Sequence, residues 1–491
     1  MNKLLQILTQ EHALLRVVCP CVVLPDTDLP ALLMQMHATL ADFRTRKGFG
    51  RAMAAPQVGI VKRIIVMNLG ASPFALINPE FTWRSEAMQT VWDDCLSVPD
   101  CLVRLQRHAS VSVKYLDEYG RERHWQNLPA DLAELVQHEM DHLDGILMTE
   151  RATTPDCIRP VSEHAALTGA ARPTHRLSLA QIARSASVIP AEFLNSPQYD
   201  CEPLSEALGC HLTLKLDFTN PIRSFKGRGA SFFVSEMQRR GDTRAIVCAS
   251  AGNWGQAMAY ACRSFGLPIV VYASVHANPL KVARMKALGA EVRQEGNDFD
   301  AAKDAAKAYA KNINGWMVED GLNAEISEGH GTLAMELLSR GHAFDAVTIP
   351  LGNGALLNGM ARWFKAASPS TRVLGVSASG ADAMEKSWRS KTIVTQEAVA
   401  TIADGIAVRV PIPEAVDDMQ GLVDDVLLIN DGHIVKAMRL VQQHAGLVLE
   451  PAGAVGVAAI LANRQQFAGQ EVATILCGSN ITPLQISEYL Q

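Results

Sequence analysis

The sequence predicts two domains of different fold class joined by a linker. The chain has 491 residues, which is enough for two or three domains. Residues 1–155 carry their own set of motifs, and residues 156–176 contain prolines and glycines that interrupt any periodic pattern. From residue 177 to residue 491, strand-like and helix-like segments alternate, which is typical of an α/β domain built on a doubly wound sheet.

Composition and charge narrow the class of protein. Apolar residues make up 48% of the chain and charged residues 20%, so we expect a full globular core. The net charge is −6 and the basic residues are not clustered, which argues against nucleic-acid binding. No apolar run reaches the roughly 20 residues that span a bilayer, and the polar N-terminus does not resemble a signal peptide. The ten cysteines contain no C-x-x-C pair. We therefore expect a cytoplasmic protein without membrane or nucleic-acid partners.

Three motifs stand out in the N-terminal module. A glycine- and alanine-rich loop at 48–59 precedes a strand predicted at 64–67. A second stretch, 92–99, follows a predicted strand and contains Cys95. The third is an H-E-x-x-H motif at 138–142, on a helix predicted over 130–143. On a helix, this spacing brings two imidazoles onto one face with a carboxylate beside them.

The H-E-x-x-H motif indicates a metal site. His138 and His142, together with the distant thiolate of Cys95, would supply three ligands and leave one position open for water. A metal ion lowers the pKa of the water that it binds, and Glu139 would take the proton from that water. We therefore expect one divalent metal ion in this module, with iron, zinc and nickel all open.

In this order, the three motifs resemble those of peptide deformylases. The resemblance covers most of residues 20–150 and implies an α+β domain. It also implies that the Gln57 side chain and the Leu96 backbone N–H face the oxyanion formed during hydrolysis of a formyl group. The sequence departs from the family motifs in two places: Asp93-Asp94 stands where the family has Glu-Gly, and Ala52 stands at a motif glycine. The methyl group of Ala52 and the carboxylate of Asp94 would change the shape or the charge of the substrate groove. The alternative is a non-catalytic module that binds or oligomerises.

In the C-terminal domain, residues 220–230 surround a lysine that could form a Schiff base. Lys226 lies among glycines and after the aromatic Phe225, between a predicted strand at 212–216 and a predicted helix at 230–237. Three further glycine-containing loops each follow a predicted strand. They are 250–257 after strand 245–248, 350–356 after strand 346–349, and 476–480 after strand 472–475.

This order of loops resembles the fold-type II (tryptophan-synthase-β-like) enzymes, which use pyridoxal 5′-phosphate. The resemblance runs from about residue 177 to residue 491 and is greatest to serine/threonine dehydratases, whose pattern is also found at 401–408 and 450–454. It implies an α/β fold of two subdomains, with the smaller one at about 245–330. The cofactor would then lie in the cleft between them.

The resemblance implies roles for individual residues. Lys226 would hold pyridoxal 5′-phosphate and then remove the α-proton of the substrate. Phe225 would lie against the pyridine ring, and Asn253 would bond the 3′-oxygen of the cofactor. The phosphate would be bound by backbone N–H groups at Gly352, Asn353, Gly354, Ala355 and Leu356. The substrate carboxylate would be held by Ser250, Ala251, Gly252, Asn253 and Gln256.

Cys477 narrows the choice of reaction class, because the resemblance places it as the partner of the pyridine nitrogen of the cofactor. A thiol can form a hydrogen bond with that nitrogen without keeping a proton on it, which suits elimination. Ala251 replaces the serine of the related racemases, so racemisation is disfavoured. Residues 375–383 lack the acidic pair that binds a divalent ion in metal-activated relatives, so we expect no metal in this domain.

These predictions combine into a bifunctional enzyme. The N-terminal domain would hydrolyse an N-formyl compound, and the C-terminal domain would carry out β-elimination on a serine- or threonine-like amino acid. The order makes chemical sense, because a formamide cannot form an imine until its amine is free. β- or γ-replacement, as in threonine and cysteine synthases, is the alternative for the second reaction. We expect a small amino acid or N-formyl amino acid as substrate and, by analogy with the fold, a homodimer.

Overall fold

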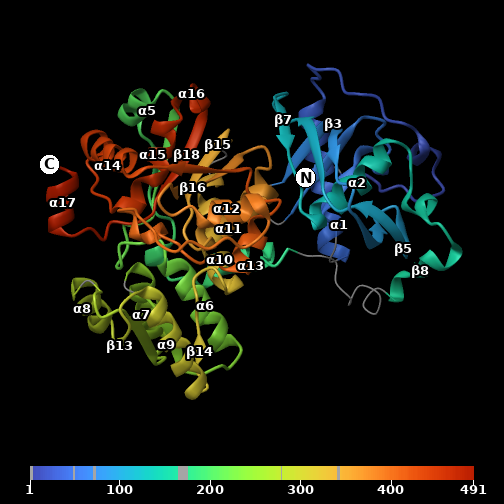
Figure 1. Cartoon of the computed structure of the whole chain (residues 1–491). Helices are drawn as coiled ribbons and strands as arrows, with labels where there is room; N and C mark the ends of the chain where they lie inside the picture. The colour runs from blue at the N-terminus through green and yellow to red at the C-terminus, as the bar shows by residue number, and fades with distance from the viewer. Residues whose placement is uncertain are drawn as a thin grey trace. The chain divides into compact units, whose positions relative to one another are not determined.

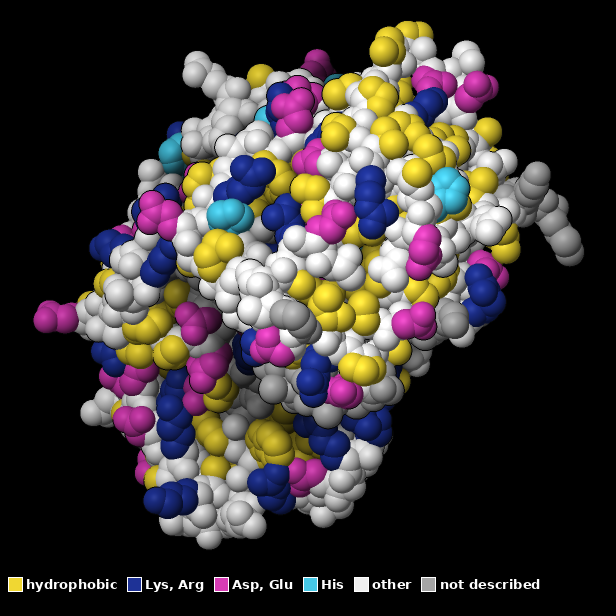
Figure 2. Space-filling model, turned by 90° about the vertical axis from the view of Figure 1, so that its right-hand side faces the viewer, with side chains coloured by type: hydrophobic (Ala, Val, Ile, Leu, Met, Phe, Trp, Pro, Cys, Tyr) yellow, Lys and Arg dark blue, Asp and Glu magenta, His cyan; other side chains and the backbone are white. Residues whose placement is uncertain are grey.

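The computed structural model divides the chain into two compact units, Met1–Arg176 and Leu177–Gln491 (Figure 1). It describes residues 4–47, 50–69, 73–163, 175–250, 252–277, 279–339 and 343–491. Within these residues, no helix is long and apolar enough to cross a membrane. The ten cysteines form no disulfide with one another. Basic and acidic side chains are interspersed on the face of the molecule that Figure 2 shows.

The described part of the first unit contains two antiparallel sheets. The larger sheet has five strands in the order β1-β2-β3-β6-β7, and the smaller has three in the order β4-β5-β8. Helix α1 packs on β1 and β2, whereas α2 packs on β1 and β5 and so contacts both sheets.

The bounds of these elements follow from the chain in order. The strands are β1 (Ala52–Ala54), β2 (Ile64–Met67), β3 (Phe74–Arg84), β4 (Met88–Cys95), β5 (Val98–His108), β6 (Val111–Leu116), β7 (Glu122–Trp125) and β8 (Ile158–Pro160). The helices are α1 (Leu29–Lys47) and α2 (Ala130–Leu143), with short 3-10 helices at η1 (Ala13–Arg16), η2 (Ala55–Val58), η3 (Met148–Arg151), η4 (Pro155–Cys157) and η5 (Val161–Glu163).

Helix α2 confirms the helix predicted over 130–143, and all its residues from Leu132 to Leu143 are buried. The predicted loop at 48–59 is wrong for its second half, because Ala52–Ala54 pair with β2 and Ala55–Val58 form a 3-10 helix. Cys95 is the last residue of β4, so the motif at 92–99 begins within a strand rather than after it. Residues 48 and 49 lie outside the described residues.

The predicted linker at 156–176 begins too early. Ile158–Pro160 form β8, which pairs antiparallel with residues 101–103 of β5. The prolines of this stretch interrupt local periodicity, but an edge strand takes its hydrogen-bond partners from its neighbour and tolerates proline. Local pattern therefore could not reveal it. Residues 164–174 of the predicted linker lie outside the described residues.

The second unit alternates strands and helices, which confirms the predicted α/β class. One sheet has six strands in the order β17-β16-β15-β18-β10-β9, and every neighbouring pair is parallel except β9 with β10. A second sheet has four parallel strands in the order β13-β12-β11-β14. Strands β11 and β15 are buried over their whole length, as parallel strands covered by helices on both faces are.

The elements of this unit are shown in Figure 1. The strands are β9 (Gln198–Asp200), β10 (His211–Leu216), β11 (Ile246–Ala249), β12 (Ile269–Ala273), β13 (Glu291–Gln294), β14 (Trp316–Met317), β15 (Ala346–Pro350), β16 (Arg372–Ala378), β17 (Asp425–Ile429) and β18 (Glu471–Leu476). The helices are α4 (Leu179–Val188), α5 (Glu202–Leu208), α6 (Gly227–Arg239), α7 (Asn253–Phe265), α8 (Pro279–Ala287), α9 (Phe299–Asn312), α10 (Ala324–Leu338), α11 (Ala355–Ala367), α12 (Ala383–Ser390), α13 (Pro413–Met419), α14 (Asp431–Ala445), α15 (Val455–Ala462), α16 (Arg464–Phe467) and α17 (Pro483–Tyr489), with η6 (Ala191–Phe193), η7 (Asp404–Ile406) and η8 (Pro451–Ala454).

The sheet topology brings distant loops to one edge. Strands β10, β18 and β15 are parallel neighbours, so their carboxyl ends lie side by side. The lysine loop follows β10, the loop at 477–480 follows β18, and the loop at 351–354 follows β15. Open α/β sheets bind their ligands at this edge.

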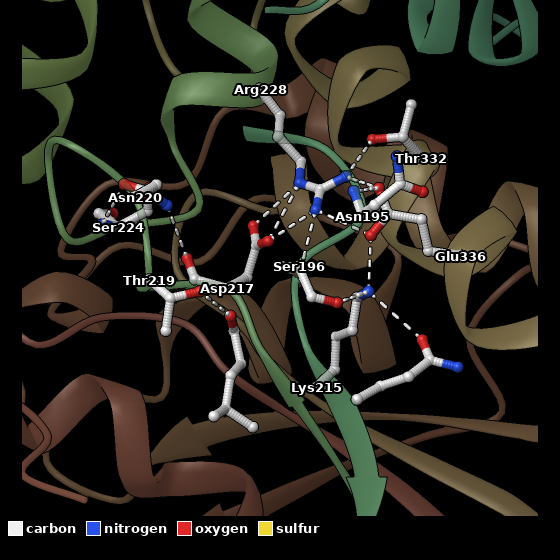
Figure 3. A network of polar contacts seen from close by, with 12 residues as sticks. Asn195, Ser196, Lys215, Asp217, Thr219, Asn220, Ser224, Arg228, Thr332 and Glu336 are labelled. Atoms are coloured by element: carbon white, nitrogen blue, oxygen red, sulfur yellow. Dashed lines mark hydrogen bonds and ion pairs between the residues drawn. The ribbon is translucent and has the colours of Figure 1, made fainter. Parts of the chain in front are cut away.

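Arg228 holds three elements of the second unit together (Figure 3). It is fully buried near the start of α6, and its guanidinium donates to Asp217 after β10 at 2.7 Å and to Glu336 of α10 at 2.5 Å. Lys215 of β10 reaches the same Glu336 carboxylate at 2.6 Å. Burial alone would raise the pKa of Glu336, but the hydrogen bonds and charge of Arg228 hold it below its ordinary value. Two cations and two carboxylates therefore balance one another away from water.

Replacing Arg228 by methionine should lower the free energy of unfolding by about 3–5 kcal/mol, because it leaves the buried Asp217 carboxylate without its cation and leaves Glu336 with Lys215 alone. Urea unfolding followed by circular dichroism measures this loss. The control is Arg239→Met on the same helix, where the side chain is 53% exposed in its pair with Glu236. We expect at most about 1 kcal/mol there. Equal losses in the two variants would contradict the role of the network.

Candidate active sites

The first unit brings the three predicted metal ligands together. Cys95 ends β4, and His138 and His142 lie one turn apart on α2. All three are buried, and their ligand atoms lie within 4.8 Å of one another. The Cys95 Sγ is 3.2 Å from the His142 Nε2. One thiolate and two imidazoles in this arrangement are a typical donor set for a divalent metal with an open coordination position.

A chain of charged groups orients His138. Its Nδ1 lies 3.0 Å from an oxygen of Asp93, which leaves the Nε2 for a metal. Arg107 donates to the other Asp93 oxygen at 2.6 Å and to Asp141 at 2.9 Å. Burial would raise the pKa of Asp93, but the charges of His138 and Arg107 hold it well below its ordinary value. Asp93 therefore stays ionised and positions the ligand, although it is shorter than the glutamate of the family motif.

Glu139, Gln57 and Leu96 surround the triad. Glu139 is buried, its Oε2 has no hydrogen-bond partner among the described residues, and burial raises its pKa to about 7. The Gln57 amide nitrogen lies 3.6 Å from the Cys95 Sγ, and its oxygen accepts from the Ala54 N–H at 2.8 Å. Leu96 directly follows Cys95 and is 8% exposed. The unpartnered carboxylate oxygen fits a site built to hold a water or a substrate beside a metal.

In the second unit, Lys226 lies at the start of α6, after a loop that Asn220 organises. The Asn220 oxygen accepts from the Ser224 N–H at 3.3 Å, and its amide donates to the Ser224 carbonyl oxygen at 3.1 Å (Figure 3). Gly229 lets the helix approach α10, since a Cβ there would lie 2.6 Å from the carbonyl oxygen of Ile326. The glycines on either side of Arg228 are therefore packing positions.

The Lys226 side chain lies in a cavity of about 600 Å³. Its Nζ is 5.2 Å from the centre of the Phe225 ring and 5.9 Å from the Trp254 ring. It also forms an ion pair with Asp320. Other lining residues are Ser250, Gly252, Asn253, Asn353, Thr401 and Asp404. The volume is that of a site for a small cofactor and its substrate.

The predicted phosphate loop joins β15 to α11. Gly354 has φ +92°, a left-handed conformation that favours glycine. A Cβ at Gly352 would lie 2.9 Å from the carbonyl oxygen of Gly405, so the loop also needs a glycine there. Ala355 and Leu356 begin α11 and carry N–H groups of its first turn, and Asn353 lines the cavity. These groups fit a phosphate.

Asn253 belongs to a network that the sequence analysis did not include. Its amide donates to Glu450 at 2.6 Å, and its oxygen accepts from the Asn480 amide at 2.7 Å. Glu450 is buried against Gly478, where a Cβ would lie 1.7 Å from the Glu450 Oε1. Burial raises the pKa of Glu450 to about 7, and the charge of Asp404 adds to the effect. A buried carboxyl group thus lies one hydrogen bond from the predicted cofactor ligand.

Ser250 organises the loop that is predicted to hold the substrate carboxylate. Its Oγ accepts from the N–H groups of Gly252 at 3.1 Å and Gly255 at 2.9 Å, which caps the first turn of α7. Gln256 is buried, and its Nε2 has no hydrogen-bond partner among the described residues. Ala251 lies outside the described residues. A free amide donor beside a helix N-terminus fits a carboxylate.

Cys477 lies directly after β18, at the edge of the site. Its carbonyl oxygen accepts from the Phe225 N–H at 3.1 Å, which ties the lysine loop to the sheet. Its thiol donates to the Ala452 carbonyl oxygen at 3.6 Å, and burial raises the pKa of the thiol so that it stays neutral. Lys226 and Asn353 of the phosphate loop line one cavity, and the neutral thiol of Cys477 lies behind the lysine loop without being among the cavity's lining residues. The amine and the phosphate loop fit pyridoxal 5′-phosphate.

Comparison with known families agrees with this interpretation. The family model described as pyridoxal-phosphate dependent enzyme matches residues 190–478. The chain belongs to this family. The model described as polypeptide deformylase matches residues 4–156. Both resemblances drawn from the sequence are thereby confirmed, and so is the combination of the two folds in one chain.

The pyridoxal-phosphate dependent domain has curated relatives with named activities. The L-threonine ammonia-lyase of Thermotoga maritima is 33% identical over 278 residues, which cover 57% of this chain and 69% of that protein. The L-threonine ammonia-lyase of Geobacter sulfurreducens is 30% identical over 283 residues, covering 58% of this chain and 70% of that protein.

Solved structures show the same fold. The processed form of threonine deaminase isoform 2 from Solanum lycopersicum has a TM-score of 0.59 and 26% identity, covering 64% of this chain and 88% of that chain. The serine racemase of Dictyostelium discoideum has a TM-score of 0.57 and 26% identity, covering 62% of this chain and 99% of that chain.

Sequence reasoning missed three polar residues of the pyridoxal-phosphate site. Glu450 and Asn480 lie within stretches that carry the family resemblance, so their motifs offered a signal although no role was assigned to them. Asp320 lies in no motif, and only its contact with Lys226 reveals it.

Replacing Cys95 or His142 by alanine should lower bound metal from about one ion per chain to near zero, because each removes one of three ligands. Elemental mass spectrometry of purified protein measures the content. Asp93→Asn should keep the ligands but weaken metal affinity by about 10–100-fold in competition with a chelator. The matched control is Cys101→Ala on β5, which lies outside the ligand triad. Full metal content in the Cys95 variant would rule out this site.

Glu450→Gln should change the pH dependence of stability. With its pKa raised to about 7, Glu450 binds a proton more tightly in the folded chain than in the unfolded chain. The folded state therefore loses stability as pH rises from about 5 to about 8, by about 1–3 kcal/mol. Glutamine cannot ionise, so the variant should lose less over that range. Thermal unfolding of both proteins without cofactor at several pH values measures the difference, and parallel curves would contradict the raised pKa.

Proposed function

We propose that the C-terminal domain catalyses β-elimination from a serine- or threonine-like amino acid, giving a 2-oxo acid and ammonia. The observation that carries this is the cavity shared by Lys226, Asn253 and Asn353 of the phosphate loop. The identities to L-threonine ammonia-lyases support the reaction class.

The residues of the cavity divide the chemistry among them. Pyridoxal 5′-phosphate, when bound, supplies an electron sink for the charge that develops at the substrate Cα. Lys226 removes the α-proton, and the Ser250 loop with Gln256 binds the substrate carboxylate. Because Cys477 keeps its proton, it would leave the pyridine nitrogen of the cofactor uncharged. An uncharged nitrogen makes the cofactor a weaker electron sink, which favours rapid loss of the β-substituent. Because Ala251 carries no hydroxyl group that could act as an acid or base on the second face of the substrate, we retain elimination over racemisation.

We further propose that the N-terminal domain hydrolyses an N-formyl compound. A divalent metal held by Cys95 and the two histidines would supply Lewis acidity. Glu139, with a pKa near 7, accepts the proton of the attacking water and passes it to the departing amine. The Gln57 amide and the Leu96 N–H would donate to the oxygen of the formyl group, as the resemblance to deformylases implies.

The rim of this metal site is charged. Arg51 donates to Glu134 at 2.9 Å, and Glu134 lies one turn before His138 on α2. Burial lowers the pKa of Arg51, but the neighbouring carboxylates, Glu134 foremost, raise it above its ordinary value. Asp94 adds a further carboxylate next to Cys95. Charged groups at this position favour a polar group over an apolar side chain beside the formamide, which fits a small N-formyl amino acid.

We propose a shared substrate only because the two domains are fused in one chain. An amine freed from its formyl group is the form that can react at Lys226, so the first product would be the second substrate. The departures from the family motif at Ala52 and Asp94 leave a binding or oligomerising module as the rival interpretation. A homodimer remains our proposal by analogy with the fold.

Assays of the full chain with pyridoxal phosphate and metal test the two activities. L-Serine or L-threonine should yield 2-oxo acid and ammonia, and N-formyl-L-serine should yield formate first. Lys226→Ala should lose 2-oxo acid formation but keep formate release. Glu139→Gln should lose formate release by about 10²–10⁴-fold but keep turnover of the free amino acids. Absence of formate from every N-formyl compound tried would leave the first domain as a binding module.

A further inference from the structure

Asp320 is a carboxylate of the cavity that contacts the reactive amine directly. It lies between β14 and α10, and its side chain, 8% exposed, forms the ion pair with Lys226. One of its oxygens, Oδ1, is buried without a hydrogen-bond partner among the described residues. Both residues line the same cavity. A buried acceptor without a partner costs free energy of folding, and a catalytic role is one reason for which proteins retain such a group.

The backbone around Asp320 is constrained. Gly321 has φ +99°, and a Cβ there would lie 2.3 Å from the carbonyl oxygen of Asn353 in the phosphate loop. The strand before it is tied to the smaller sheet, since the Val318 N–H donates to the Val247 carbonyl oxygen at 2.9 Å. Only glycine combines that φ with that close approach. The turn therefore presents Asp320 to Lys226 at a defined place next to the phosphate loop.

Three other acidic groups of the cavity wall have different ionic partners. Glu319 pairs with Lys303 and Lys307 of α9. Asp404 pairs with Lys281 at 2.7 Å. Asp300 pairs with Arg409. Asp320 thus differs from its neighbours, because its ionic partner is the amine that performs the chemistry.

We propose that Asp320 relays a proton from Lys226 to the β-hydroxyl group that leaves the substrate. This inference rests on the proposed elimination. Lys226 takes the proton of the Cα–H bond, whose electron pair forms the Cα=Cβ double bond as the Cβ–O bond breaks. Hydroxide is a poor leaving group, so the oxygen must receive a proton as it departs. The proton taken by Lys226 passes to Asp320 and from it to the oxygen, which leaves as water.

The relay balances without any further reactant. Lys226 enters the step as an uncharged amine, not as the ammonium of the ion pair, and it ends uncharged. Asp320 is ionised both before and after the step. The unsaturated amine that is released tautomerises and takes up one water to give the 2-oxo acid and ammonia. The relay also defines the substrate class, because it serves β-substituents that leave only when protonated. A β-chloro substituent leaves as chloride and does not need it.

The test compares L-serine with β-chloro-L-alanine in the full chain loaded with pyridoxal phosphate. Asp320→Asn should lower kcat for L-serine by about 10²–10³-fold, while kcat for β-chloro-L-alanine falls less than about tenfold. The visible absorbance band of the bound cofactor reports that the variant is folded and loaded. Asp304→Asn on α9, an exposed carboxylate, is the control and should leave both substrates unaffected.

The outcomes separate this inference from the proposed function. Loss of both substrates to the same degree, or no loss of L-serine turnover, would overturn the relay while elimination stands. A wild-type protein that turns over neither substrate would overturn the elimination and the relay with it. If Asp320→Asn does not load the cofactor, Asp320→Ser is compared in the same way, and selective loss of L-serine turnover again supports the relay.

Discussion

The buried ion cluster around Arg228 is the constraint on which the pyridoxal-phosphate site depends. A guanidinium without water must have carboxylates around it, and Asp217 and Glu336 supply them from the end of β10 and from α10. Arg228 is two residues from Lys226, so the same pairs that satisfy the charge also fix the start of α6. Because α10 follows directly on the Asp320 turn, one cluster determines the position of the amine and of the carboxylate that faces it.

In each of the two sites, burial raises the pKa of one carboxyl group. Glu139 beside the metal ligands and Glu450 beside Asn253 both have a pKa raised to about 7, and burial is the leading cause in each. A carboxyl group whose pKa lies near 7 can accept and return a proton at neutral pH with little cost in free energy. The surroundings differ, since Glu139 has an oxygen without a partner among the described residues whereas Glu450 accepts a hydrogen bond. Glu139 therefore keeps an acceptor open beside the predicted metal ligands, whereas Glu450 fixes the side chain of Asn253.

The metal site keeps its geometry despite its departures from the family motif. Asp93 still reaches the His138 ring and is held by Arg107, so the shorter side chain preserves the orientation of the ligand. Asp94 introduces a carboxylate where the family carries a glycine, directly before the ligand Cys95. We therefore expect the departure at Asp94 to affect which compound binds, whereas the one at Asp93 leaves the predicted ligand set as it is.

Many of the helices and strands of both units could be predicted from the sequence. Helix 130–143 with its two histidines and the strands before each loop follow from local periodicity and spacing, which depend on neighbouring residues only. Lys226 was predicted from the order of four loops, which resembles that of a known family. Local periodicity did not predict β8, whose pairing partner β5 lies about 55 residues earlier in the chain. The partners of the predicted site residues could be found only in the folded chain. Lys226 meets Asp320 across 94 residues and Asn253 meets Glu450 across 197. Such contacts leave no local pattern, because they arise from the order of strands in a sheet and from the burial of charge.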